Sequence, residues 1–525
     1  MTGGSTPEAS SMTGAESLIA TLIAGGVEAC FANPGTSEMH IVAALDRIEG
    51  MRCVLGLFEG VVTGAADGYA RMAEKASCTL LHLGPGFANG LANLHNASRA
   101  QVPMVNVVGQ HATFHLRYDT PLTSDIEAFA RPYSKWMRTS AAPSEVGRDG
   151  MEALVAARTA PGQIATLIVP ADVAWGEGGK AAAVSSTAMP PMPDAAKIER
   201  AAAMLRSGLP TAILLGGNAL FGKGLATAGR IAAATGARLL APYPFTRIER
   251  GAGRAIVERI PYVLDQAAEM LSGLRQLILV GTRPPVAYFA HPEKNAEATP
   301  PGCKAETLAA PGEDYRGALE ALEAALSASA KEIVAEKPER PALPTGAITL
   351  PGLAAAVGAL LPENAIVADE SMTTGRAMMA AARGGSPHDW LACTGGSIGI
   401  AMPLALGAAV ACPNRRVLCL TADGSGMYTA QALWTMAREG LNVTTVVLAN
   451  RVYAVLQREF ASLGLGTPGA RASGLFEIGR PDLDWVSLAK GMGVPGTRVG
   501  SLDDFTKALR RGFESAGPTL IEVPL

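Results

Sequence analysis

The sequence lacks the cysteine patterns that mark disulfide frameworks and zinc sites. Its seven cysteines are odd in number and form no C-x-x-C pair, which is typical of reduced thiols in a cytoplasmic protein. The first residues also lack a basic stretch followed by an apolar core, so no secretory signal is expected and residues 1–13 are predicted to be a disordered tail. These absences favour a cytoplasmic location.

The sequence also has no excess of charge of one sign. It contains 44 basic and 47 acidic residues, for a formal net charge of −3, with no long run of either sign. Nucleic-acid-binding proteins carry a basic patch or stripe, so no nucleic-acid partner is expected. Charged residues make up only 17% of the chain and hydrophobic residues 48%, a balance that favours a loop-rich α/β enzyme acting on a small molecule.

One stretch lacks charge altogether. Residues 390–414 include no Asp, Glu, Lys or Arg, and a stretch of this length is long enough to cross a bilayer. However, glycines and prolines interrupt it, and its flanks show neither an aromatic belt nor a strong basic bias. We therefore expect no membrane partner and predict a buried segment instead.

Short apolar runs alternate with helix-like segments throughout the chain. Runs such as 78–83 and 104–108 are bounded by glycine and proline, as expected of buried parallel strands. This alternation predicts stacked α/β units. Proline-rich stretches separate three blocks of typical domain size. The predicted domains span residues 14–188, 194–336 and 345–525.

The segment 416–448 is the most informative. It predicts a βαβ unit with a strand at 417–421, a loop at 422–427, a helix at 428–439 and a strand at 443–448. Asp423 then follows the first strand and Asn450 the second, at the sheet edge where such folds bind ligands. These oxygens suit Mg²⁺, and Gly424 and a helix N-terminus suit a phosphate. The alternative is an ordinary turn with a helix cap.

Ala422-Asp-Gly-Ser425 followed by Asn450 resembles the metal–diphosphate motif of thiamine diphosphate (ThDP) enzymes, usually written Gly-Asp-Gly-Ser followed by Asn-Asn. Ala422 and Ala449 depart from that pattern without removing a metal ligand. The resemblance implies ThDP and Mg²⁺ as cofactors. The implied metal ligands are Asp423, Asn450 and the backbone carbonyl of Val452, and the implied cofactor contacts nearby are Asp423, Gly424, Ser425, Asn450, Tyr453 and Ala454.

The segment 55–71 is similar to the region of the family that carries the glutamate bonded to the aminopyrimidine ring, which places Glu59 in that catalytic role. The residues themselves agree. Glu59 lies between an apolar run and the small, apolar start of a helix, so it should be partly desolvated, as a proton-sharing carboxyl requires. The alternative is a glutamate that only complements the helix dipole.

The loop Asn33-Pro34-Gly35 resembles the Asn-Pro-Gly loop that faces the active site in this family. The resemblance is strongest to the benzoylformate decarboxylase branch. It implies His82 as a catalytic proton donor or acceptor and Thr36 as the matching catalytic hydroxyl. For a second histidine supplied by the middle domain, either Tyr288 or His291 is a candidate.

The uncharged stretch resembles the segment that lies under the cofactor. Within it, Ile398 is the candidate wedge that bends the cofactor, with Ser397 beside it; the alternative is an ordinary core isoleucine. Thr373 or Thr374 would bind the diphosphate. A glycine-rich loop at 215–218 lacks the full G-x-G-x-x-G pattern, so no FAD or NAD is expected there.

The resemblance extends from about residue 14 to the end of the chain. It implies three doubly wound parallel-sheet α/β domains. These are a pyrimidine-binding domain (14–188), a middle domain (194–336) and a pyrophosphate-binding domain (345–525). The implied reaction is decarboxylation of a 2-oxo acid through an enamine. The alternatives are a carboligase of acetolactate synthase type, which would also use an aldehyde or second 2-oxo acid, and a non-catalytic ThDP-fold binding subunit. The implied assembly is a homodimer or homotetramer with active sites at subunit interfaces.

Overall fold

The computed structural model describes residues 12–292 and 294–525, which form two compact units divided after Ala188. Residues 1–11 of the predicted tail lie outside the described residues. The end of that tail differs from the prediction, because Met12 and Thr13 form strand β1 (Met12–Thr13), which pairs with β8 (Glu177–Gly179). The hydroxyl of Thr13 also accepts a hydrogen bond from the backbone of Glu16 and caps the first helix.

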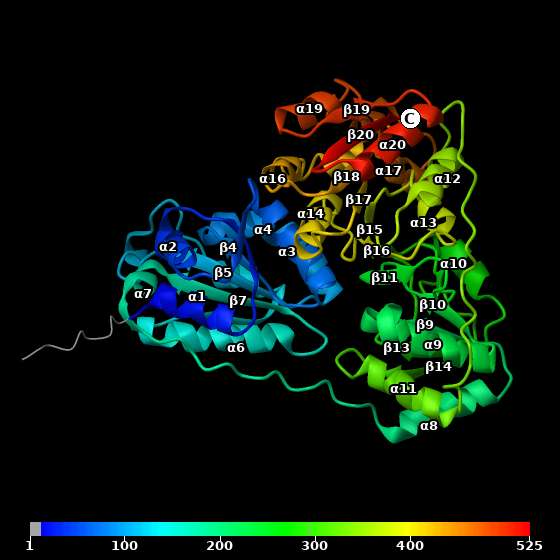
Figure 1. The fold of residues 1–525 in the computed structure, drawn as a ribbon, viewed down its shortest axis with the longest axis horizontal. Helices are drawn as coiled ribbons and strands as arrows, with labels where there is room; N and C mark the ends of the chain where they lie inside the picture. Colours follow the sequence, from blue (N-terminus) through cyan, green and yellow to red (C-terminus); the bar gives the residue numbers. More distant parts are fainter. Residues whose placement is uncertain (1–11, 293) are drawn as a thin grey trace, which may run out of the picture. The chain divides into compact units, whose positions relative to one another are not determined.

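A parallel sheet of six strands forms the centre of the first unit (Figure 1). Its strand order is β3 (Arg52–Leu55), β2 (Ala29–Asn33), β4 (Ser77–Leu81), β5 (Met104–Gln110), β7 (Ile164–Pro170) and β6 (Ser134–Thr139). The helices are α1 (Gly14–Ala24), α2 (Met39–Arg47), α3 (Glu59–Ala73), α4 (Leu83–Ala100), α5 (Ile126–Ala130), α6 (Val146–Arg158) and α7 (Ala171–Trp175).

Helices cover both faces of this sheet. Cys30 and Ala32 share a hydrophobic core with α1, α2 and α6. Phe31 points to the opposite face of β2, because side chains alternate along a strand, and its ring lies 5.9 Å from the ring of Tyr69 in α3. The helix that begins at the predicted catalytic glutamate therefore packs directly on the sheet.

A buried ion pair stiffens α3. Arg71 donates two hydrogen bonds to Asp67 one turn earlier, at 2.7 and 2.6 Å, and neither side chain is exposed. Burial raises the pKa of Asp67, while the attraction of Arg71 opposes that rise. Loss of either partner would leave an uncompensated buried charge, at a cost of about 3–5 kcal/mol. The Asp-Gly-Tyr-Ala-Arg sequence at 67–71 therefore has a structural role.

The second unit contains two sheets. The first has five parallel strands in the order β12 (Glu258–Arg259), β10 (Arg238–Ala241), β9 (Thr211–Leu215), β13 (Gln276–Val280) and β14 (Lys304–Ala309). The second has the order β11 (Arg247–Arg250), β16 (His388–Ala392), β15 (Ile366–Glu370), β17 (Val417–Ala422), β18 (Val443–Ala449), β20 (Thr519–Pro524) and β19 (Gly496–Arg498). All its neighbours are parallel except β11, which runs antiparallel to β16.

Helices flank both sheets of the second unit (Figure 1). They are α8 (Ala195–Arg206), α9 (Gly222–Thr235), α10 (Leu264–Leu271), α11 (Tyr315–Ala325), α12 (Leu350–Leu360), α13 (Met378–Ala381), α14 (Ala401–Ala411), α15 (Asp423–Gly426), α16 (Ala432–Arg438), α17 (Ala454–Ser462), α18 (Ala470–Phe476), α19 (Trp485–Gly491) and α20 (Leu502–Glu514). One hydrophobic core runs through both sheets and includes Ile213, Trp390 and Phe505. The parallel sheets with flanking helices confirm the predicted α/β fold class.

The uncharged stretch 390–414 contributes the end of β16, a loop and α14. Residues 401–410 of α14 are all buried, so an apolar surface on every side of the helix faces protein. None of the helices in the described ranges has the length and apolarity that a membrane span requires.

The crevice of the five-stranded sheet is filled by a tyrosine. The strand order reverses between β9 and β13, where this type of sheet binds a dinucleotide. Gly217 and Gly281 lie at these two strand ends with positive φ values of 51° and 64°, and the buried ring of Tyr315 lies against both. A Cβ atom at Gly281 would be only 2.6 Å from Cζ of Tyr315. Tyr315 thus packs against both strand ends, and the absence of FAD and NAD stays a prediction.

Candidate active site

The predicted catalytic glutamate lies at the start of a helix in the first unit. Glu59 is the first residue of α3 and is only 7% exposed. Its Oε2 accepts a hydrogen bond of 3.0 Å from Nδ2 of Asn89 in α4. A Cβ atom at Gly86 would lie 3.0 Å from Oε1. One carboxylate oxygen is therefore held in place, while the other lies beside a residue without a side chain.

The α4 residues that support Glu59 were not predicted from the sequence. Asn93 donates a hydrogen bond of 2.7 Å to the carbonyl of Gly60, and the Thr63 hydroxyl donates one of 3.0 Å to the carbonyl of Gly90. With Gly86 and Asn89, these residues form a stripe at helical spacing. Glycine and asparagine at this spacing are the signal in the sequence for a face of α4 that packs against polar groups of another helix, here α3.

His82 is held by a buried carboxylate. It follows β4 directly and precedes α4, and its Nδ1 lies 2.7 Å from Oε2 of Glu38. The side chain of Glu38 is fully buried, whereas that of His82 is 22% exposed. Burial raises the pKa of Glu38 and outweighs the opposing attraction of His82. Glu38 is a second functional candidate that the sequence analysis missed.

Two glycines make this Glu38–His82 pair possible. The backbone N–H of Gly35 donates to Oε2 of Glu38 at 2.8 Å, and a Cβ atom at Gly35 would lie 2.3 Å from Nδ1 of His82. A Cβ atom at Gly109 would lie 1.7 Å from Oε1 of Glu38. Side chains at these positions would displace the pair, which explains why the Asn-Pro-Gly loop ends in glycine.

The predicted loop residues lie at the same sheet edge. Asn33 ends β2 and pairs with Leu81, the residue before His82. Pro34 and Gly35 follow it. Thr36 begins a 3₁₀ turn at Thr36–Glu38 and is exposed. The structure therefore brings Asn33, Gly35 and His82 together and places Thr36 nearby in the chain.

Two further histidines follow β5. The rings of His111 and His115 are 5.8 Å apart, and Nε2 of His111 lies 3.3 Å from the Thr120 hydroxyl. Burial lowers the pKa of His111, with smaller contributions from the charges of His115 and His82. Both were missed in the sequence, although His111 follows the carboxyl end of a predicted strand, which is where ligand-binding residues of such sheets lie.

In the second unit, the structure brings the predicted metal ligands together. β17 and β18 are neighbours, and Asp423 and Asn450 follow their carboxyl ends. Oδ2 of Asp423 accepts a hydrogen bond of 2.6 Å from the backbone N–H of Arg451, and Oδ1 accepts one of 2.9 Å from Gly424. Oδ1 of Asn450 accepts one of 3.2 Å from the N–H of Val452.

The local structure around Asp423 differs from the predicted loop and helix. Residues 423–426 form the short helix α15, and the following helix α16 begins only at Ala432. The cause lies in the intervening turn, where the Thr429 hydroxyl donates a hydrogen bond of 2.7 Å to the carbonyl of Gly399. This tertiary contact ties the turn to the uncharged stretch, and it cannot be read from local spacing.

The donor set fits a small, hard cation. Asp423 is 2% exposed, burial raises its pKa, and it forms no ion pair among the described residues. The charge of Arg451 opposes that rise without cancelling it, so a bound cation would stabilise the buried carboxylate further. The described residues contain no cluster of three or more His, Cys, Asp or Glu suited to a metal. The predicted ligand set is of another kind, because it has one carboxylate, Asp423, beside the amide oxygen of Asn450 and the backbone carbonyl of Val452.

The loop before α14 is fastened by a carboxylate. Glu370 is 3% exposed and accepts hydrogen bonds from the backbone N–H groups of Gly399, Ile400 and Ala401, at 2.9 to 3.2 Å. Burial raises the pKa of Glu370 to about 8, while these hydrogen bonds oppose the rise. Glu370 thus anchors the loop that carries Ser397 and Ile398, both of which are half-buried.

The predicted diphosphate contacts lie after β15. The hydroxyl of Thr374 donates to the carbonyl of Ser371 at 2.9 Å, whereas Thr373 is half-buried beside it. Tyr453 precedes α17, where Ala454 is the first residue. A Cβ atom at Gly424 would lie 2.5 Å from Cε1 of Tyr453, so only glycine allows this close approach.

The structure distinguishes the two candidates in the middle region. A Cβ atom at Gly396 would lie 2.1 Å from the hydroxyl oxygen of Tyr288, so Tyr288 reaches the loop that holds Ser397 and Ile398. Nε2 of His291 instead lies 3.0 Å from the carbonyl of Ser462 at the end of α17. Tyr288 is therefore the better candidate for a residue supplied to the site.

Comparison with known proteins identifies the relatives of this chain. Residues 12–128 match the family model "Thiamine pyrophosphate enzyme, N-terminal TPP binding domain", and residues 373–523 match the corresponding C-terminal domain. A Mycobacterium tuberculosis protein with the provisional name acetolactate synthase large subunit IlvX is 52% identical over 98% of this chain and 99% of its own length. Benzoylformate decarboxylase of Pseudomonas aeruginosa is 28% identical over 95% of this chain and 96% of its own length.

Solved structures show the same fold. The ThDP-dependent 4-hydroxybenzoylformate decarboxylase of Rhodococcus jostii RHA1 superimposes with a TM-score of 0.85 at 24% identity, covering 98% of this chain and 99% of that one. This chain thus shares its fold with an enzyme over almost the full length of both chains.

Proposed function

Because this chain belongs to the family of thiamine pyrophosphate enzymes, we propose that it uses ThDP and Mg²⁺ to decarboxylate a small 2-oxo acid. The observation that carries the proposal is the Glu38–His82 pair at the sheet edge that also holds the Asn-Pro-Gly loop. A buried carboxylate that fixes one nitrogen of a histidine leaves Nε2 to exchange a proton with a substrate. Decarboxylation to an aldehyde requires such a proton.

The residues that would hold the cofactor lie in both units. Asp423, Asn450 and the carbonyl of Val452 would bind Mg²⁺, which prefers a few oxygen ligands plus phosphate. The proposed cofactor contacts are Asn33, Pro34, Gly35, Glu59, Thr373, Thr374, Ser397, Ile398, Gly424, Ser425, Tyr453 and Ala454. Since family members bind the cofactor between two subunits, we propose that Glu59 and Asp423 of different copies share one site.

When bound, ThDP would supply a nucleophilic carbon for the keto group and an acceptor for the electrons released with CO₂. Glu59 would hold the proton that is shared with the aminopyrimidine ring, because Asn89 fixes one carboxylate oxygen and leaves the other beside Gly86. Glu38 orients His82, which would give the product its proton. Burial of Glu59 and Glu38 keeps water away from the two carboxylates.

A homodimer is the smallest assembly that this arrangement allows, and a homotetramer is the other possibility. The exposed surface of α17 and α18 supports an assembly of more than one copy. Neither helix contains a buried residue in the single chain, and both expose a large apolar side chain, Leu456 and Leu475. None of the seven cysteines, all of which lie in the described ranges, forms a disulfide, which supports the proposed cytoplasmic location.

Product analysis tests the reaction. The purified protein with ThDP and Mg²⁺ is incubated with pyruvate, benzoylformate and branched-chain 2-oxo acids, and we expect an aldehyde from at least one of them. Acetolactate without aldehyde would replace the decarboxylase proposal by the carboligase alternative, which the name of the 52% identical relative favours. Absence of turnover with every substrate would support the non-catalytic alternative, against which the position of Glu59 argues.

The role of Glu38 is tested by Glu38→Gln. Glutamine keeps the size of the side chain but cannot stabilise a positive His82, so we expect kcat to fall by about 10- to 100-fold, part of what general acid–base catalysis contributes. We expect KM and ThDP affinity to change little and the pH profile of kcat to change. Steady-state kinetics across pH measures both.

Glu28→Gln is the matched control. Glu28 directly precedes β2, whereas Glu38 lies beyond the other end of β2, and Glu28 pairs with Lys75 on the surface. In a His82→Ala background, Glu38→Gln should cost nothing further if Glu38 acts through His82. An unchanged pH profile with lowered thermal stability would show that Glu38 has only a structural role.

A further inference from the structure

Three cysteines form a row across the sheet of the first unit. Cys30 in β2 is the register partner of both Cys53 in β3 and Cys78 in β4. Register partners in neighbouring parallel strands point to the same face of the sheet, and the strands lie about 4.8 Å apart. Cys30 and Cys78 belong to the core that the sheet shares with α1, α2 and α6. The three thiols therefore lie side by side on that face.

The effects of these thiols on one another agree with this placement. A hydrogen bond with Cys78 and burial raise the pKa of the Cys30 thiol. Burial raises the pKa of Cys53 to about 11, with a smaller contribution from Cys30. The central thiol thus interacts with a thiol on each side.

The row runs from the surface into the core. Cys53 is exposed and lies in the edge strand, whereas Cys30 and Cys78 are buried. Cysteine behaves as a small apolar residue in cores, which explains the two buried thiols. Packing does not explain an exposed thiol whose register partner is a second thiol. A small reagent from solvent reaches Cys53 first, with Cys30 next to it.

The two strands of this pair lead to the candidate active site. β2 ends at Asn33, shortly after Cys30, and β3 ends at Leu55, shortly before Glu59. A disulfide holds its two Cβ atoms about 3.5–4.5 Å apart, which is less than the spacing of neighbouring strands. A bond between Cys30 and Cys53 would therefore draw β2 and β3 together and move the Asn-Pro-Gly loop relative to Glu59.

We propose that Cys53 and Cys30 are a modification site, at which a peroxide forms a reversible disulfide that displaces the active-site segments and lowers activity. Strained or exposed disulfides are the labile, regulatory ones, and disulfides in a reducing compartment are usually transient. Formation of the disulfide rests on the cysteine row alone, whereas its effect on activity rests on the proposed function.

The reaction balances with one molecule of hydrogen peroxide. The Cys53 thiolate attacks one peroxide oxygen, the O–O bond breaks, and hydroxide leaves and takes up the thiol proton to form water, which gives a sulfenic acid. The Cys30 thiolate then attacks Sγ of Cys53, the S–O bond breaks, and the second hydroxide takes up the Cys30 proton. The two sulfurs lose two electrons, the peroxide gains them, and two waters form.

This oxidation should be slow. The thiolate is the reactive form of cysteine, and the raised pKa of Cys53 leaves little of it ionised near neutral pH. The pair would therefore respond to sustained exposure to peroxide and not to a brief pulse.

Hydrogen peroxide treatment of the reduced full-length protein, with ThDP and Mg²⁺ bound, tests the site. We expect two fewer free thiols than the seven of the reduced chain, a mass lower by two hydrogens, and a linked pair of peptides that contain Cys30 and Cys53. A thiol reductant should reverse all three changes. Cys53→Ser should abolish the disulfide, and Cys30→Ala should leave an oxidised but unlinked Cys53, because no thiol then resolves the sulfenic acid.

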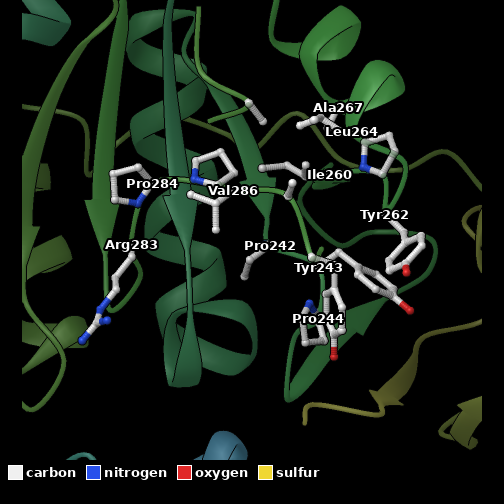
Figure 2. Close-up of a pocket in the computed structure, with 15 residues that line it drawn as sticks. Pro242, Tyr243, Pro244, Ile260, Tyr262, Leu264, Ala267, Arg283, Pro284 and Val286 are labelled. Carbon is white, nitrogen blue, oxygen red and sulfur yellow. The ribbon is translucent and has the colours of Figure 1, made fainter. Parts of the chain in front are cut away.

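Cys303→Ser is the matched control. Cys303 lies in the second unit, is half-buried, and has a pKa that burial raises, as at Cys53. Ala298, shortly before it, lines a cavity of about 330 Å³ (Figure 2), and none of the described residues that line this cavity is a cysteine. Cys303→Ser should therefore form the disulfide as the wild type does. Absence of a disulfide after prolonged treatment, a linked pair other than Cys30 and Cys53, or the same pair of thiols lost in Cys53→Ser would overturn the proposal.

The effect on the site is measured by 2-oxo acid turnover. A displacement of about 1 Å can cost about 100-fold in rate, so the oxidised wild type should turn over at least about tenfold more slowly and recover on reduction. Cys53→Ser should keep its activity under the same treatment. Full activity of the linked protein, or an equal loss in Cys53→Ser, would overturn the effect on activity.

The peptide map and the thiol count do not depend on turnover, so failure of this proposal is distinct from failure of the proposed reaction. If the protein turns over none of the 2-oxo acids, ThDP affinity becomes the second measurement. Titration of ThDP into the reduced and the oxidised protein should then show at least about tenfold weaker binding after oxidation, because Glu59 and the Asn-Pro-Gly loop are displaced. Equal affinities would overturn the displacement.

Discussion

Glu59→Gln should lower kcat by about 10²- to 10⁴-fold, the contribution of a positioned general acid–base group, while the fold persists. Glutamine has the shape of glutamate, and its side-chain oxygen can still accept the hydrogen bond from Asn89. It cannot share an exchangeable carboxyl proton with the aminopyrimidine ring. Steady-state kinetics at saturating ThDP measures the loss, and circular dichroism with thermal unfolding verifies the fold.

The control separates this chemistry from a general loss of negative charge at a helix start. Glu145 is the N-cap residue of α6 in the same unit, and among the described residues it pairs only with Arg148, at the surface. Glu145→Gln should therefore leave kcat unchanged. Full turnover in Glu59→Gln would contradict the proposed mechanism, because a proton-sharing carboxyl would then be unnecessary.

The sequence predicts those parts of the fold whose signal is local. Buried parallel strands are short apolar runs between turn residues, and the predicted strands at 417–421 and 443–448 match β17 and β18 to within one residue at their ends. The αβ crossover from Asp423 to Asn450 likewise follows from spacing. A motif at two strand ends is brought together by the parallel pairing itself, so chain order is enough to locate it.

Partners that approach from other elements could not be predicted in this way. Glu38 reaches His82 across 44 positions, and Glu370 reaches the N–H groups of residues 399–401 across about 30. Each is a single carboxylate in an unremarkable local sequence. What identifies it is burial, and burial depends on how β2, β4 and the loop before α14 are placed by tertiary packing.

Asp423→Asn should weaken Mg²⁺-dependent ThDP binding by at least about 100-fold. Loss of a residue that only supports a metal ligand already costs about 10- to 100-fold in metal affinity, and Asp423 is the one carboxylate in the proposed ligand set. Asparagine keeps the oxygen that accepts from Gly424 or Arg451 but not the charge. Equilibrium titration of ThDP at fixed Mg²⁺, and of Mg²⁺ at fixed ThDP, measures both affinities.

Thermal unfolding of the same variant gives an independent result. Without cofactor, Asp423→Asn should be at least as stable as the wild type, because it removes a buried carboxylate that has no ion-pair partner. Cofactor at 100 times its Kd should stabilise the wild type by about 2.7 kcal/mol and the variant by far less. Asp482→Asn is the control. Oδ1 of Asp482 lies 3.1 Å from Nε of Arg451, whose backbone bonds Asp423, and the Asp482 side chain is exposed. Equal losses of ThDP affinity in both variants would show that nearby charge, and not a ligand at Asp423, holds the cofactor.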